Sequence, residues 1–206
     1  MKKCFVFGAL KTEKLPIVPS DGDLIIAADK GLESVKGLSL NADMIIGDFD
    51  SLGYVPKGKD IELLPVRKDD TDVGYAINKG LSMGYKSFVV YGCLGGALDH
   101  TLANIQLAAA ISKRGGRAVF IGDNTYLTAI TNGTLSVENG RGRISVFASF
   151  GKAKGVTLKG LDYSLDNAVI TEDFPIGVGN HFKEKSAYIS VENGTLIIIS
   201  EYPVSV

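Results

Sequence analysis

The sequence predicts an α/β protein with an N-terminal doubly wound, mostly parallel sheet domain and a C-terminal all-β sandwich domain. In the first part, short continuous apolar runs alternate with segments of helical period, as strands buried on both faces alternate with helices. From about Thr131 onward, no long stretch carries helical periodicity, and Asn-Gly pairs accompany short alternating runs. We therefore expect two domains, residues 1–131 and residues 132–206.

Six short apolar runs in the first domain have the length and composition of strands. They lie at residues 3–7, 24–28, 44–46, 61–66, 87–91 and 117–121. One helix is expected after Thr71, a good N-cap, because Val73, Ile77 and Leu81 follow at helical spacing. A second helix is expected over 99–114, and Gly115-Gly116 ends it. Its apolar face is expected to contain Leu98, Leu102, Ile105 and Ala109.

The second domain is marked by Asn-Gly pairs at 132–133, 139–140 and 193–194. Both residue types tolerate a positive φ, so each pair predicts a hairpin turn between two strands. The alternating runs at 144–148, 187–191 and 196–199 are the expected strands. A β domain that spans residues 132–206 has a size that suits a sandwich.

The composition is that of an ordinary globular protein, with 206 residues, 45% hydrophobic residues and a formal net charge of −1. The charge gives no basic surplus, so we expect neither a nucleic-acid partner nor a membrane partner. No apolar run reaches the length of a signal peptide or a membrane span, so the cytoplasm is the expected compartment. Cys4 and Cys93 lie in apolar runs and are expected to be core residues.

Two aspartates, Asp48 and Asp50, follow the strand at 44–46. In extended backbone, residues i and i+2 point to the same side, so these carboxylates should converge while Phe49 turns into the core. Two adjacent carboxylates repel each other unless a cation lies between them, and Mg²⁺ prefers oxygen ligands. The alternative is that both aspartates only cap a solvated loop.

Aspartates or glycines follow other predicted strands as well, at Asp29, at 69–72 and in a glycine loop at residues 92–96. Because ligands of open α/β sheets bind at the carboxyl ends of the strands, we expect these residues to form one site. Asp72, in the first turn of its helix, is then expected to share a divalent ion with Asp48 and Asp50. These residues predict magnesium-dependent phosphoryl transfer and leave the substrate open.

Several segments together resemble the thiamine pyrophosphokinase family. They read A-A-D-K-G (27–31), A-D-M-I-I-G-D-F-D-S-L (42–52), K-D-D-T-D (68–72), G-G-A-L-D-H-T-L-A-N-I (95–105), G-V-T-L-K-G-L-D-Y-S-L-D-N-A (155–168) and G-V-G-N-H-F (177–182). The resemblance implies an α/β domain joined to a β-sandwich, a homodimer, and transfer of a pyrophosphoryl group from ATP to thiamine, giving thiamine diphosphate and AMP.

The resemblance also implies roles for individual residues. Mg²⁺ ligands are implied at Asp48, Asp50 and Asp72, and catalytic roles at these three and at Asp29 and Asp99. Contacts to ATP are implied at Asp29, Thr71, Gly95, Gly96, Asp99, His100 and Asn104, and we expect a further one at Lys30, which the family pattern does not include. Thiamine contacts at the dimer interface are implied at Ser164, Asn167 and Asn180. Either Asp29 or Asp99 would accept the proton of the thiamine hydroxyl.

The sequence departs from the family pattern at two positions, since relatives usually have glycine where Lys30 stands and arginine where Ala97 stands. One hypothesis is that Lys30 supplies the positive charge that arginine supplies in relatives, and the alternative is that Lys30 points to solvent and the site does without that charge. Two other functions stay open: pyrophosphoryl transfer to a different alcohol such as a pterin, and a catalytically weak module that binds nucleotide or thiamine.

Overall fold

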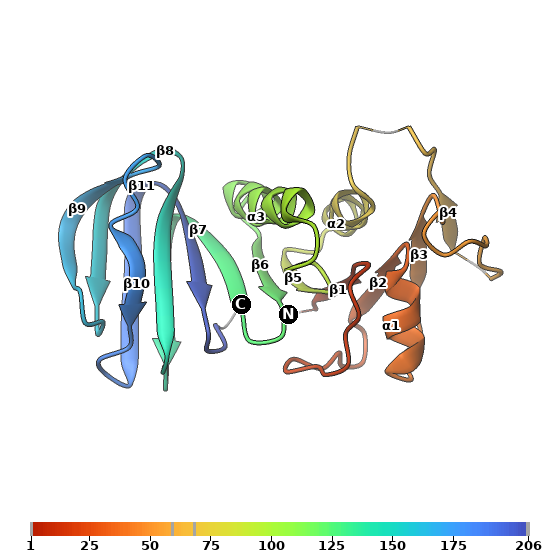
Figure 1. Cartoon of the computed structure of the whole chain (residues 1–206), viewed down its shortest axis with the longest axis horizontal. Helices are drawn as coiled ribbons and strands as arrows, with labels where there is room; N and C mark the ends of the chain where they lie inside the picture. Colours follow the sequence, from red (N-terminus) through yellow and green to blue (C-terminus); the bar gives the residue numbers. More distant parts are fainter. Residues whose placement is uncertain (1, 59, 68, 205–206) are drawn as a thin grey trace. The chain divides into compact units, whose positions relative to one another are not determined.

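The computed structural model describes residues 2–58, 60–67 and 69–204 (Figure 1), so Lys68 of the motif at 68–72 lies outside the described residues. The chain divides into two compact units, Met1–Asn104 and Ile105–Val206. The first contains a parallel sheet and the second is rich in β-strands, which confirms the predicted fold class. The boundary between these units lies inside a helix, and the domain boundary after residue 131 stays a prediction.

The parallel sheet of the first unit has the strand order β5-β1-β2-β3-β4. Its strands are β1 (Cys4–Phe7), β2 (Leu24–Ala28), β3 (Met44–Gly47), β4 (Ile61–Leu63) and β5 (Ser87–Tyr91). Every residue of β1, β2 and β5 is buried, as expected for continuous apolar runs in a parallel sheet. Strand β4 is shorter than predicted because Pro65, which has no backbone N–H, follows its end.

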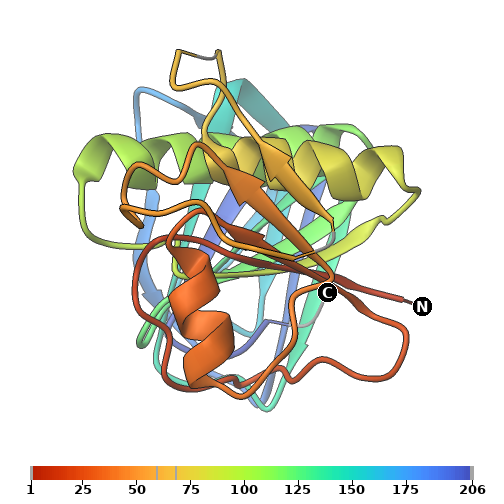
Figure 2. The same ribbon diagram turned by 90° about the vertical axis from the view of Figure 1, so that its right-hand side faces the viewer.

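Three helices accompany these strands: α1 (Gly31–Gly37), α2 (Asp72–Ser82) and α3 (Leu98–Lys113). Figures 1 and 2 show α1 and α2 on opposite sides of the parallel sheet. The hydroxyl oxygen of Thr71 accepts a hydrogen bond from the N–H of Gly74 at 3.0 Å, so the predicted N-cap is confirmed. Helix α1 was not predicted because its seven residues include two glycines, at its first and last positions.

The predicted apolar face of α3 is wrong over its first turns. Leu98 and Leu102 are 82% and 54% exposed. The buried positions of the helix instead follow the spacing of Asn104, Ala108 and Ile111. The polar Asn104 occupies a buried place because its side chain has a hydrogen-bond partner there, described below. The periodicity of apolar residues alone could not identify this buried face of α3.

The second unit contains strands with the pairing order β10-β8-β11-β7-β6, and β9 pairs with β8. They are β6 (Arg117–Ile121), β7 (Tyr126–Glu138), β8 (Arg143–Lys159), β9 (Leu165–Thr171), β10 (Gly177–His181) and β11 (Ser186–Ser200). All these pairings are antiparallel. Of the three predicted hairpins, only the one at 139–140 connects two strands, β7 and β8.

The other two Asn-Gly pairs lie inside the long strands β7 and β11, so those hairpin predictions are wrong. The register between β7 and β11 shifts between Val191 and Thr195, opposite Asn132. Asn132 has a φ of +47° and accepts a hydrogen bond from the N–H of Gly194 at 2.8 Å. The tolerance of a positive φ that suits a hairpin turn also suits a β-bulge, and here it forms a bulge.

Candidate active site

A cavity of about 530 Å³ lies in the first unit, at the carboxyl ends of its strands. Its lining comes from segments that directly follow β1, β2, β3 and β5, and from the first turns of α2 and α3. The strands are parallel, so their carboxyl ends meet at one edge of the sheet. The strand order changes direction between β1 and β5, which is where ligands bind in open α/β sheets.

Asp29 is the most deeply buried carboxylate of this cavity, with 5% of its surface exposed. It follows β2 with a φ of +48°, and its N–H donates to the carbonyl of Ile46 at 2.8 Å, which fixes the turn against β3. A non-glycine residue in this conformation is uncommon. Within the described residues, its Oδ1 atom is buried and has no hydrogen-bond partner. A buried carboxylate oxygen of this kind calls for a ligand.

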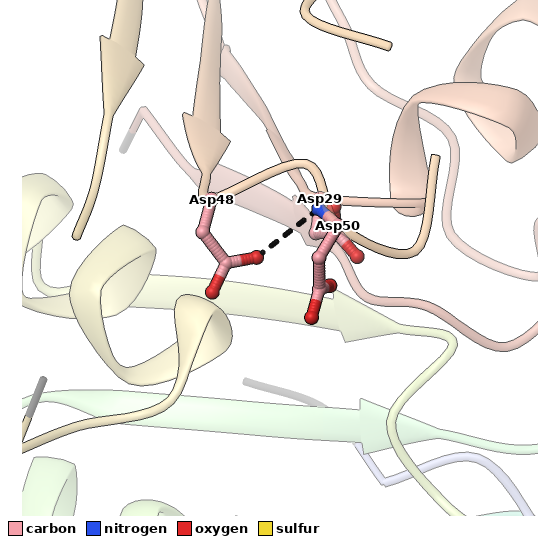
Figure 3. Close-up of side chains that lie close together, drawn as sticks. All are labelled: Asp29, Asp48 and Asp50. Atoms are coloured by element: carbon pink, nitrogen blue, oxygen red, sulfur yellow. Dashed lines mark hydrogen bonds between the residues drawn. The ribbon is translucent and has the colours of Figure 1, made fainter. Parts of the chain in front are cut away.

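Asp48 and Asp50 converge beside Asp29, and Figure 3 shows their carboxylates on the same side of the loop after β3. The N–H of Asp50 donates to Oδ1 of Asp48 at 3.3 Å. Phe49 is 2% exposed, so its predicted burial is confirmed. The predicted extended backbone is wrong, however, because β3 ends at Gly47 and Phe49 has a φ of +61°. A left-handed turn, rather than the alternation of a strand, brings the two carboxylates together.

One oxygen from each of Asp29, Asp48 and Asp50 lies within 4.8 Å of the others. Oxygens on opposite sides of a bound Mg²⁺ are about 4.2 Å apart, twice the usual 2.1 Å bond length. A small contraction of the three side chains would therefore suit a divalent cation. The hard oxygen donors and the unpartnered Oδ1 of Asp29 fit this kind of ion.

The start of α2 contributes Thr71 and Asp72 to the same cavity. The N–H of Thr71 donates to Oδ1 of Asp70 at 2.8 Å, so the N-cap is itself held in place. Asp72 lies outside the group of three converging carboxylates, and Asp29 takes the third place in that group. Direct ligation of a metal by Asp72 stays a prediction.

The glycine loop forms another wall. Gly92 has a φ of +68°, and a Cβ atom there would lie 2.5 Å from the carbonyl oxygen of Leu10, so this position requires glycine. The side-chain amide of Asn104 donates to the carbonyl of Cys93 at 2.7 Å. The hydroxyl of Thr101 donates to the carbonyl of Gly95 at 2.9 Å. Helix α3 thus holds the loop at two points.

The other predicted ATP contacts divide into two groups. His100, Asn104 and Gly95 line the cavity, as does Ala97 at the position of the expected family arginine. Asp99 is exposed, and its Oδ1 accepts the N–H of His100 at 2.8 Å. Neither Asp99, Gly96 nor Lys30 belongs to the lining. Lys30 lines a second, adjoining cavity, so it and position 97 face different spaces.

Cys93 also lines the cavity, but its chemistry is that of a core residue. Burial raises the pKa of its thiol to about 12, only partly offset by a backbone hydrogen bond from Gly8. The thiolate is the reactive form of cysteine, so this group is not a nucleophile at neutral pH. Sequence reasoning missed Ala9 and Leu10, which follow β1 and line both cavities. The one feature of the sequence that could have indicated them is that they directly follow a predicted strand and Gly8.

The three predicted thiamine contacts belong to the second unit. Ser164 and Asn167 are exposed, and Asn167 has a φ of +46°. Asn180 is only 2% exposed. Its Oδ1 accepts the N–H groups of Tyr163 and His181 at 2.9 and 3.0 Å, and its amide donates to the carbonyl of Tyr163 at 2.7 Å. These bonds give Asn180 a structural role, and its contact with thiamine stays a prediction.

Two family models match the chain. The one described as "Thiamin pyrophosphokinase, catalytic domain" matches residues 18–120, which include the carboxylates and the glycine loop. The one described as "Thiamin pyrophosphokinase, vitamin B1 binding domain" matches residues 136–196 of the β-rich unit. Both halves of the chain are therefore matched by domains of one family, in the order that the sequence predicts.

Individual relatives agree with this assignment. A curated protein, thiamine pyrophosphokinase of Bacillus subtilis (strain 168), is 26% identical over 184 residues, which cover 85% of this chain and 86% of that protein. The crystal structure of thiamine pyrophosphokinase from Bacillus subtilis has a TM-score of 0.84 at 24% identity, covering 97% of this chain and 98% of that one.

The thiamin pyrophosphokinase from Geobacillus thermodenitrificans has a TM-score of 0.82 at 22% identity, and each chain is covered to 98%. The yeast enzyme shares the fold with a TM-score of 0.75 at 12% identity, covering 99% of this chain and 86% of that one. At these identities the structural likeness establishes the fold, and the family follows from the two matching domain models. The chain belongs to the thiamin pyrophosphokinase family.

Proposed function

We propose that the protein transfers a diphosphoryl group from ATP to the primary hydroxyl of thiamine, giving thiamine diphosphate and AMP. The observation that supports this most directly is the convergence of Asp29, Asp48 and Asp50 in a cavity that the glycine loop also lines. Carboxylates that can hold a divalent cation, next to a loop whose backbone can approach phosphate, are the parts that phosphoryl transfer requires.

Asp48 and Asp50 would hold Mg²⁺, with Asp29 or Asp72 completing the set. When bound, Mg²⁺ supplies neutralisation of the negative charge on the transferring group. The chain's own residues position the reactants: Thr71 and the glycine loop place backbone groups at the cavity, and His100 offers a ring N–H. Of the two candidate proton acceptors, Asp29 lines the cavity and Asp99 does not, so Asp29 takes this role when Asp72 completes the metal set.

Thiamine is favoured over a pterin or another alcohol because a vitamin B1 binding domain model matches residues 136–196. Exposed residues of the second unit, Ser164 and Asn167, remain our candidates for contacts to thiamine. The same unit exposes several large apolar side chains: Tyr163, Val169, Phe174, Ile176 and Val178. A set of this kind suits an interface, and we propose that the protein is a homodimer.

The function is tested by incubating the pure protein with ATP, Mg²⁺ and thiamine and following AMP and thiamine diphosphate by chromatography. We expect equimolar amounts of the two products and none when Mg²⁺ is replaced by excess chelator. Turnover only with a pterin alcohol would favour the other substrate class. Binding of ATP and thiamine without turnover would favour a binding module, in which Ala97 would be the first position to examine.

The homodimer is tested by light scattering with the protein at its working concentration, where a monomeric mass would contradict it. In the described part of the chain, no helix is long and apolar enough to cross a membrane. Both cysteines are buried free thiols, which supports the reducing cytoplasm as the expected compartment.

A further inference from the structure

Asp70 lies directly before the N-cap of α2, and both of its carboxylate oxygens accept hydrogen bonds within the chain. Oδ1 accepts the N–H of Thr71 at 2.8 Å, and Oδ2 accepts the side-chain amide of Asn78 at 3.1 Å. Asn78 lies about two turns further along the helix. The carboxylate therefore connects the residue that starts α2 to the body of the same helix.

Gly74 provides the space that this carboxylate occupies. A Cβ atom on Gly74 would overlap the carboxylate of Asp70, which is the nearest group to that position. Gly74 lies in the first turn of α2, where the backbone is helical and does not by itself require glycine. Alanine is the better helix former at such a position, so the carboxylate, rather than the backbone, accounts for the glycine.

The start of α2 also reaches the carboxylate cavity. Thr71 and Asp72 belong to its lining, and Asp70 is not among the described residues that line it. The N–H of Thr71 is held by Asp70, and its hydroxyl oxygen accepts the N–H of Gly74 at 3.0 Å. The residue that precedes Asp72 is thus fixed through both its backbone and its side chain.

Asp48 and Asp50 reach the same cavity from the loop after β3, a separate segment of the chain. The separation between their carboxylates and that of Asp72 therefore depends on how firmly the start of α2 is held. Displacement of a group in an active site by about 1 Å can lower a rate by about 100-fold. A residue that fixes the start of α2 would influence the reaction without touching a substrate.

We propose that Asp70 is a positioning residue: its carboxylate, lying against Gly74, holds Thr71 and Asp72 in place at the carboxylate cavity. The inference rests on the proposed function for the reaction that these residues serve. It assigns to Asp70 no contact with ATP, thiamine or a metal ion.

The test combines substitutions at both positions with steady-state kinetics and urea unfolding. Asp70→Ala and Gly74→Ala should each lower kcat/KM about tenfold or more, the first by removing the carboxylate and the second by displacing it. In the double variant, the methyl group at position 74 fills the space that the carboxylate has left. Its urea midpoint should therefore rise above those of both single variants, while its kcat/KM stays low.

Asp70→Asn is the conservative variant, and it tests the inference whatever the stability of the other variants. Its Oδ1 still accepts the N–H of Thr71, and the amide of Asn78 can turn to offer its oxygen to the new NH₂ group. Its kcat/KM should stay within about threefold of the wild type. Ser82→Ala, which removes a hydrogen bond to the carbonyl of Lys79 at the other end of α2, is the control and should leave kcat/KM unchanged.

Unchanged kcat/KM in Asp70→Ala would overturn the inference. Recovery of kcat/KM together with the urea midpoint in the double variant would also overturn it, because Asp70 would then serve stability alone. Equal losses in Asp70→Asn and Asp70→Ala would have the same consequence, since the charge of Asp70 rather than its hydrogen bonds would matter.

Calorimetric binding of Mg²⁺ together with the α,β-methylene analogue of ATP separates this inference from the proposed function. The Kd of the analogue should rise about tenfold in Asp70→Ala and stay near the wild-type value in Asp70→Asn. That result in a protein that makes no thiamine diphosphate would support the positioning role and reject only the reaction. An unchanged Kd in Asp70→Ala would count against the positioning role itself.

Discussion

Asn104 and Cys93 join α3 to the glycine loop through a hydrogen bond of 2.7 Å between the side-chain amide and the backbone carbonyl. Asn104 is 6% exposed and Cys93 is 4% exposed, so the bond is largely shielded from bulk solvent. Asn104 lines the cavity, and this hydrogen bond means that it also sets the position of the loop.

Asn104→Ala should therefore lower both stability and activity. It leaves the carbonyl of Cys93 buried without its partner, which costs about 1–3 kcal/mol in the free energy of unfolding. A displaced glycine loop should lower kcat/KM by about 10- to 100-fold. Urea unfolding and steady-state kinetics measure the two effects. Gln106→Ala, at an exposed position of the same helix, is the control, and an equal effect there would contradict the role of Asn104.

Replacing the carboxylates singly by Asn should remove turnover while the fold remains. Asp29→Asn, Asp48→Asn and Asp50→Asn should each lower kcat by about 100-fold or more and weaken Mg²⁺ binding. The thermal midpoint without Mg²⁺ should hold or rise, because repulsion within the cluster decreases. Calorimetric titration with Mg²⁺ gives a readout besides activity, and Asp166→Asn, at an exposed position, is the control.

Asp72→Asn distinguishes the predicted ligand set from the observed cluster. If Asp72 binds the metal, Asp72→Asn should weaken Mg²⁺ binding as much as Asp48→Asn does. Normal Mg²⁺ affinity in Asp72→Asn would leave Asp29 as the third ligand.

The location of the site at the carboxyl ends of the strands was predictable from the sequence, because a parallel sheet brings these ends together for any conformation of the loops. It did not predict the details of the loops. Phe49 was expected in a strand and adopts a left-handed conformation, and Asp29, expected beside the nucleotide, joins the metal-type cluster. Both depend on backbone angles after the strand end, which apolar periodicity does not encode.

A helix was predicted correctly where its sequence carries a clear capping residue followed by helical periodicity. Thr71 followed by helical periodicity gave α2, whereas α1, with glycines at both ends, had no such signal. Leu98 and Leu102 were misplaced because a buried hydrogen bond at Asn104, rather than hydrophobicity, selects the face of α3. Asn132 shows the same limit, since a positive φ fits both a turn and a bulge.

Gly31→Ala should strongly destabilise the first unit. A Cβ at Gly31 would overlap the carbonyl oxygen of Phe7, and the backbone of β1 cannot easily move away. Overpacking of this kind costs about 1–3 kcal/mol or more. Gly37→Ala in the same helix is the matched control, because nothing lies within 4 Å of its Cβ position. Urea midpoints should fall for Gly31→Ala only, and equal stabilities would refute the close approach.

Asn180→Ala should lower the stability of the folded protein rather than remove a substrate contact. Loss of its three part-buried hydrogen bonds leaves backbone groups of Tyr163 and His181 without this partner, which costs about 1 kcal/mol in the free energy of unfolding. Ser164→Ala, at an exposed position, should keep the unfolding midpoint and raise the KM for thiamine if Ser164 contacts this substrate. An Asn180→Ala protein with normal stability and a raised thiamine KM would show a substrate contact instead.

Asp23 should contribute to stability at neutral pH and lose that contribution in acid. Burial by itself raises the pKa of the Asp23 carboxyl. Hydrogen bonds from the N–H of Lys3 and from the N–H and hydroxyl of Ser20 together lower this pKa by more than burial raises it, so the net shift is downward. The charged form is favoured in the folded state, so the stabilisation is present above about pH 4 and disappears as the pH falls through the folded-state pKa.

The difference in thermal midpoint between the wild type and Asp23→Asn should therefore narrow as the pH falls from 7 toward 3. The exposed Asp21→Asn serves as the control and should follow the wild-type curve. A constant difference between wild type and Asp23→Asn at every pH would mean that the charge of Asp23 does not contribute.

The bulge at Asn132 constrains which insertions and deletions the β-rich unit tolerates. Val191 pairs with Gly133 and Thr195 with Thr131, so residues 192–194 of β11 lie opposite the single residue Asn132. The excess is two residues, an even number, and side chains beyond the bulge keep the face that they had before it. Losing one residue here would exchange the faces of Leu196 and Ile197 relative to β7, whereas losing two would keep each side chain on its own face. Length changes at this point should therefore be tolerated in pairs.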